Sequence, residues 1–84
     1  MNFEDGQVVR ITEEWKEMTL DNASGYMFVQ RHHLFLLEKP YRNPHSGKTY
    51  EFLIRLTLLN VGGRRETFNI PIEHEDRFEL AIDI

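Results

Sequence analysis

The stretch Tyr50–Leu59, YEFLIRLTLL, decides the fold class, because a large apolar side chain recurs at every even-numbered position from 50 to 58. Successive side chains of a β-strand point to opposite faces, so this period of two predicts a strand with one buried face. The opposite face mixes Glu51 and Arg55 with Leu53 and Leu59, so it is only partly polar. Both faces of the strand therefore need some cover.

A second apolar run precedes this strand and is separated from it by polar residues. Met27–Val29 leads into Leu34–Leu37, and the following segment, Pro40–Lys48, contains Asn-Pro and Ser-Gly dipeptides. Proline fixes φ and glycine tolerates positive φ, so both dipeptides favour a turn. We predict two long apolar strands within Tyr26–Asn60, on either side of a polar turn.

The amino-terminal segments are shorter. Asp5-Gly6 predicts a turn and Val8–Thr12 a first strand. The next residues, Glu13–Met18, are good helix formers but also fit an extended chain, so we interpret them as a strand that enters a short helical turn. Asp21–Gly25 has the composition of a loop.

The carboxy-terminal segments leave one choice open. Arg64–Ile72 alternates as a strand, in which Pro71 must lie at the end or on an edge because it has no N–H to donate. In residues 73–84 the apolar side chains at positions 78, 80, 82 and 84 favour a strand that begins at Arg77. A helix that begins near Glu73 is the alternative, because acidic residues suit a helix amino terminus.

These segments together predict a mostly β protein with a single small domain over residues 1–84. A chain of 84 residues cannot support two independent cores. We expect a five-stranded antiparallel sheet or small barrel with one short helix; the alternative is an α+β fold with four strands and then a carboxy-terminal helix. Leu34–Leu37 and Leu53–Leu59 are apolar on both faces, so barrel closure or a partner should cover the second face.

Composition limits the chemistry and the compartment. The chain has no cysteine, which excludes disulfides, thiolate metal ligands and cysteine nucleophiles. No apolar run approaches the roughly 20 residues that a membrane-spanning helix needs, and the acidic start, Met1–Asp5, is unlike a signal peptide. We therefore expect a cytoplasmic protein that does not enter a membrane.

Positive charge gathers in the centre of an acidic chain. The net charge is −4, yet residues 30–65 hold seven basic side chains against two acidic ones. Basic and acidic strands could cancel by pairing across the sheet, or the centre could form a basic ridge for an anionic partner. The candidate residues for binding a nucleic acid or another anionic partner are Arg31, Lys39, Arg42, Lys48, Arg55, Arg64 and Arg65.

No catalytic or metal motif is recognisable. His32 and His33 would point to opposite faces of a strand and could not chelate one ion together. Gly62–Arg65 could cradle a phosphate, but it lacks the longer glycine pattern of a phosphate loop. We expect no enzyme activity, no cofactor and no metal site.

Two family resemblances can be named. Phe3–Ile11, FEDGQVVRI, followed by Gly25–Val29, GYMFV, looks like the opening of small Src-homology-three-like barrels. Four strands followed by a carboxy-terminal helix would be similar to the transcriptional positive-cofactor family, whose members bind single-stranded DNA as dimers. Ile54-Arg55 would match an Ile-Arg step in that family's third strand, with Thr57 where the family has an aromatic residue.

The apolar second face decides which function we expect. A sheet face that a small chain cannot cover predicts a non-enzymatic binding module that acts through protein–protein interaction, in an accessory, regulatory or inhibitory role. Such a module could also self-associate as a homodimer. The alternative is a single-stranded nucleic-acid-binding protein that uses the basic central region 31–65 to bind DNA or RNA.

Overall fold

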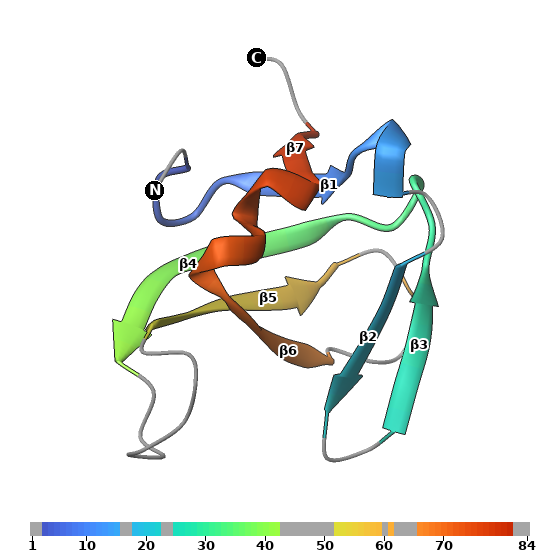
Figure 1. The fold of residues 1–84 in the computed structure, drawn as a ribbon. Coiled ribbons are helices and arrows are strands. Elements are labelled where there is room, and N and C mark those ends of the chain that lie inside the picture. Colours follow the sequence, from blue (N-terminus) through green and yellow to red (C-terminus); the bar gives the residue numbers. More distant parts are fainter. Residues whose placement is uncertain are drawn as a thin grey trace.

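Five antiparallel strands form the main sheet, in the order β6-β5-β4-β1-β7 (Figure 1). The computed structural model describes residues 3–15, 18–22, 25–42, 52–59, 61 and 66–81. A separate antiparallel hairpin joins β2 to β3. The strands are β1 (Val8–Ile11), β2 (Met18–Asn22), β3 (Gly25–Val29), β4 (Phe35–Arg42), β5 (Phe52–Leu58), β6 (Thr67–Pro71) and β7 (Phe78–Leu80).

Two 3-10 segments complete the described structure, η1 (Glu13–Trp15) and η2 (Ile72–Arg77). No α-helix occurs within the described ranges, so the prediction of a mostly β fold is confirmed and the α+β alternative is wrong. The carboxy-terminal segment, for which the sequence allowed a strand or a helix, forms a short 3-10 turn and then a short strand. Pro71 ends the edge strand β6, η2 follows as a short turn, and Phe78 then pairs with Ile11 as a strand.

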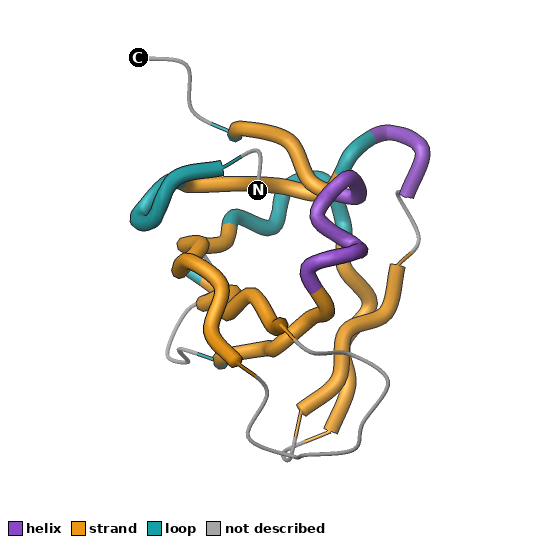
Figure 2. The backbone as a smooth tube through the Cα atoms, turned by 60° about the vertical axis from the view of Figure 1, so that its left-hand side comes forward, coloured by secondary structure: helices purple, strands orange, loops and turns teal. Residues whose placement is uncertain are grey.

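The inner face of the sheet and the inner face of the hairpin share one apolar core. Phe35 lies at its centre, fully buried, with T-shaped ring contacts to Phe68 at 6.4 Å and to Phe78 at 6.2 Å between centroids. The hairpin contributes its own inward side chains to the same cluster, so it closes the core from the side (Figure 2). The buried residues are Val9, Ile11, Met18, Leu20, Val29, Phe35, Leu37, Ile54, Leu56, Leu58, Phe68, Ile70 and Phe78.

The alternation in β5 confirms the pattern on which the fold prediction rests. Ile54, Leu56 and Leu58 are all buried on the inner face. Phe52, at the start of the strand, is 42% exposed, because it lies at the end of the sheet where little covers it. Tyr50 lies outside the described residues.

The predicted first arm of the central pair is wrong as a single strand. β3 pairs with β2 in the hairpin, whereas β4 pairs with β1 and β5 in the main sheet. A tight turn separates them: the His33 N–H donates to the Gln30 carbonyl at 2.9 Å, and the Gln30 N–H donates to His33 Nδ1 at 3.0 Å. The two histidines therefore lie in a turn and not on a strand, with ring centroids 4.3 Å apart.

Two predicted loops begin later in the chain or span fewer residues than expected. Asp21 and Asn22 belong to β2 and Gly25 begins β3, so only two residues separate the paired strands. Gly25 has φ +133°, which side-chain-bearing residues rarely adopt, and this permits the reversal. The predicted turn Pro40–Lys48 also begins too early, because β4 continues to Arg42 and a register shift after Glu38 accommodates the proline. Residues 43–51 lie outside the described part.

The outer face of the sheet is mixed, as its sequence suggested. Arg55 pairs with Asn69 and Thr57 with Thr67 across β5 and β6, so these four residues share the outer face. Leu36 is only half-buried on the same face. The sheet is not closed into a barrel within the described ranges, since its order runs from β6 to β7 and η2 links those two edges.

The central position of Phe35 leads to a stability prediction. We expect Phe35→Ala to lower the free energy of unfolding by about 3–5 kcal/mol, because it removes a buried ring and leaves a cavity. Urea unfolding followed by circular dichroism would measure the loss. Phe28→Ala is the matched control: Phe28 is 64% exposed on the hairpin, so its loss should stay below about 1 kcal/mol. Equal losses for the two variants would contradict this core.

Candidate functional site

Of the seven basic candidates, the three whose side chains are described do not form one ridge. Arg31 lies in the turn after β3, Arg55 in the middle of β5, and Arg42 at the exposed end of β4. Arg42 pairs with Phe52, whereas Arg55 belongs to the opposite, outer face. Of Lys39 only the backbone is described, and Lys48, Arg64 and Arg65 lie outside the described residues. Their predicted role stays a prediction.

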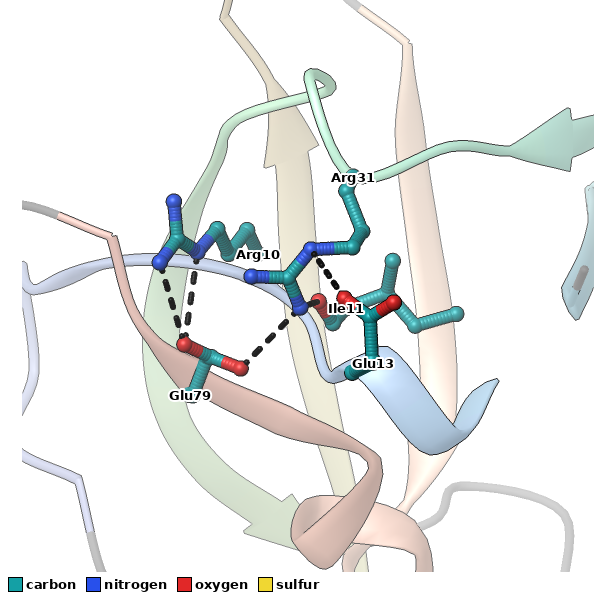
Figure 3. Close-up of polar contacts among 5 residues, drawn as sticks. All are labelled: Arg10, Ile11, Glu13, Arg31 and Glu79. Carbon is teal, nitrogen blue, oxygen red and sulfur yellow. Dashed lines mark hydrogen bonds and ion pairs between the residues drawn. The ribbon is translucent and has the colours of Figure 1, made fainter. Parts of the chain in front are cut away.

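Arg31 is held by carboxylates and by the backbone (Figure 3). Its Nη1 lies 3.2 Å from Glu79 Oε1 and also donates to the Ile11 carbonyl at 3.1 Å, while its Nε lies 3.2 Å from Glu13 Oε2. Arg10 Nη2 approaches the other oxygen of Glu79 at 3.2 Å. This ion-pair network ties the turn that follows the hairpin to β1 and β7. Arg31 thus has a structural partner on each side.

The network also lowers the pKa of the Glu79 carboxyl. The hydrogen bonds from Arg31 and then from Arg10 stabilise the charged carboxylate, and they hold its pKa below the usual 4.5. The negative charge of Glu79 therefore persists to lower pH in the folded chain than in the unfolded chain. Because the side chains are about 31–38% exposed, solvent screens part of this interaction.

Arg55, on the outer face, also forms an ion pair with a carboxylate. Its Nη1 lies 3.7 Å from Glu38 Oε2, and its guanidinium carbon lies 5.2 Å from the ring centre of Tyr41. The Tyr41 hydroxyl in turn donates to Asn69 Oδ1 at 2.6 Å. An opposite charge on the neighbouring strand thus offsets Arg55, while Glu13 and Glu79 offset Arg31 in its turn. The Arg55–Glu38 pair is an instance of the cross-strand pairing that the charge pattern allowed as an alternative to a basic ridge.

The hairpin presents an aromatic surface that the charge pattern did not indicate. Tyr26 is 68% and Phe28 64% exposed on the outward face of β3, with ring centroids 5.9 Å apart in a T-shaped contact. The alternate residues of β3 face inward, where Val29 is fully buried. One face of this strand therefore completes the core, and the other holds two large rings in solvent. We call Tyr26 and Phe28 the aromatic surface.

A concavity of about 510 Å³ adjoins the aromatic surface. Burial lowers the pKa of the His33 imidazole, and the neighbouring His32 lowers it further. His33 Nδ1 also accepts a hydrogen bond from the Gln30 N–H, which suits the neutral ring. No Lys or Arg is among the described residues that line the concavity: Asn22, Gly25, Tyr26, Met27, His33, Leu58, Val61 and Glu66.

The sequence carries a signal for the aromatic surface in the alternation of apolar residues before and after residues 23 and 24. Reading Tyr26–Val29 as part of one long central strand placed all its apolar residues near a common core. Met18 and Leu20 repeat the alternation of Met27 and Val29 on the other side of a possible two-residue turn. That mirrored pattern predicts a hairpin whose remaining aromatic residues face outward.

Neither a metal centre nor a membrane-spanning helix is found in the described part of the chain. No group of three or more His, Asp or Glu side chains there could hold a metal ion. None of the helical segments described has the length and apolar character needed to cross a bilayer. Comparison of the chain with known protein families, curated proteins and solved structures gave no match.

The lowered pKa of Glu79 leads to a pH prediction. Its stabilising effect is complete above the usual value of 4.5 and is lost as pH falls through the lowered folded-state pKa. Between about pH 5 and pH 3, the wild-type protein should therefore lose more unfolding free energy than Glu79→Gln. Urea unfolding at a series of pH values would measure how the free energy of unfolding changes with pH in both proteins.

Arg31→Gln provides the matched control for the Glu79 prediction. It removes the hydrogen-bond donor that lowers the pKa of Glu79 most, so the free energy of unfolding should also fall less between about pH 5 and pH 3. Combining it with Glu79→Gln should add little. If the free energy of unfolding fell equally with pH in the wild-type protein and in Glu79→Gln, the network would not stabilise the fold.

Proposed function

We propose that this chain is a non-enzymatic binding module that acts through protein–protein interaction. The observation that carries the proposal is the aromatic surface: two rings more than 60% exposed on a strand whose other face lies in the core. Aromatic side chains are enriched at protein interfaces and often dominate their affinity. The role is that of an accessory, regulatory or inhibitory protein.

The surroundings of the aromatic surface also support a protein partner. Asp21 lies directly across the hairpin from Tyr26, and Glu66 lines the adjoining concavity. Two carboxylates beside the rings would repel the phosphates of a nucleic acid, although exposed aromatic rings can stack on bases. A polypeptide carries no such obligatory negative charge. Apolar side chains of a partner could enter the concavity beside Met27 and Leu58.

A site-specific photo-crosslinker tests this proposal. We expect benzoyl-phenylalanine in place of Phe28 to form a discrete protein adduct in lysate of the cells that produce the protein, because this position faces the partner. The same photoreactive residue in place of Glu73, which is exposed on η2, is the control and should give none. Adding Tyr26→Thr should weaken the adduct at position 28. Adducts of equal yield at both positions, or none at position 28, would refute the proposal.

Single-stranded nucleic-acid binding remains the competing hypothesis from the basic central region. The paired state of Arg31 and Arg55 leads us to expect no saturable binding of a labelled DNA or RNA oligonucleotide at moderate salt. Fluorescence anisotropy at two salt concentrations would test this. Tight binding that falls steeply with salt, and that Arg64→Ala with Arg65→Ala abolishes, would instead favour the nucleic-acid hypothesis.

A further inference from the structure

The two described sheets have four outer strand edges, those of β6, β7, β2 and β3, and the edge of β2 lies beside β6. The edges of β6 and β7 are protected. At the β6 edge, Pro71 ends the strand, and Asn22 Nδ2 of the hairpin donates to the Thr67 carbonyl at 3.1 Å. At the β7 edge the strand is only three residues long, and its Glu79 is charged and ion-paired. Proline, charge, shortness and cover are the usual means by which proteins prevent pairing with other chains.

The outer edge of β3 has none of these protections. Its five residues, Gly25–Val29, pair with β2 along one side, and the described residues provide no strand for the other side. The strand contains no charged residue and no proline. Figure 2 shows the hairpin as a separate pair of strands beside the main sheet. An extended edge with free backbone groups can add a further strand.

We propose that the occupant of this edge is a second copy of the same chain, paired antiparallel along β3. This inference rests on the proposed function, because it names the partner of the same surface. A two-fold axis through Met27 would place Tyr26 of each copy directly opposite Phe28 of the other. The Tyr26 and Phe28 side chains share one face, so the pairing creates two aromatic cross-strand contacts at once.

The charge pattern is what favours a second copy over an unrelated segment. When a strand pairs antiparallel with its own copy, a charge near the two-fold axis lies close to the same charge of the copy, and like charges in that position are destabilising. β3 carries no charged side chain; among the other strands only β6 is also neutral, and its edge is protected by Pro71 and Asn22. The two-fold register also places an aromatic side chain opposite an aromatic side chain at both positions. The edge therefore carries no charge that would oppose self-pairing, and the register places its rings opposite rings of the copy.

Sedimentation equilibrium of the full chain, with two variants of opposite charge, tests the pairing. The wild-type protein should show a species of twice 10.1 kDa that dissociates on dilution. Tyr26→Lys with Phe28→Lys, and separately Tyr26→Glu with Phe28→Glu, should each weaken self-association about tenfold or more, because like charges then face each other. An equimolar mixture of the two variants should recover the dimer, because opposite charges then meet.

Two controls keep this test decisive. Glu73→Gln with Asp76→Asn changes the net charge by the same +2 as the lysine variant but lies on η2, and should leave self-association unchanged. Circular dichroism of each variant shows whether it folds. If a charged variant does not fold, Phe28→Thr is used in its place to test whether self-association weakens.

A monomeric wild-type protein at every concentration would overturn the self-pairing, as would a dimer that persists in both charged variants. Neither result would refute the proposed function, because the photo-crosslinker at position 28 would still reveal a different protein partner. Loss of every adduct at that position together with a monomer would refute both.

Discussion

The burial of one sheet face around Phe35 is the constraint on which the rest of the structure depends. Its ring contacts Phe68 of β6 and Phe78 of β7. The side chain of central β4 therefore contacts both edge strands, although β5 and β1 lie between them in the sheet. Five strands this short leave that face open at one side. The β2–β3 hairpin closes the opening with Met18, Leu20 and Val29, and is therefore part of the core.

Closure by a hairpin has a direct consequence for function. A two-stranded sheet has two faces, and only one can contact the core, so the aromatic residues of the other face remain in solvent. The ion pairs of Arg31 with Glu13 and Glu79 anchor the chain directly after β3. The hairpin is thus fixed at its inner face and at its base, while its outer face and outer edge stay accessible. An anchored, exposed strand loses little conformational freedom when a partner binds.

Local patterns predicted the parts of this structure that are determined locally. The alternation of Ile54, Leu56 and Leu58 revealed β5 because burial on one sheet face requires a period of two. The hairpin was missed because pairing between β2 and β3 depends on a two-residue reversal at Gly25, and composition alone resembles a loop there. The basic residues were grouped by their position in the chain, but pairing with Glu38 and Glu79 depends on strand order, which no local pattern specifies.

Solvent paramagnetic relaxation of the aromatic ring protons would test the central claim most directly. It should be measured at low protein concentration, where self-pairing is dissociated. A soluble paramagnetic agent should strongly relax the rings of Tyr26 and Phe28, which face solvent, and leave those of Phe35, Phe68 and Phe78 protected. Protected rings at Tyr26 and Phe28, or an accessible ring at Phe35, would contradict a hairpin that seals the core with one face and presents the other.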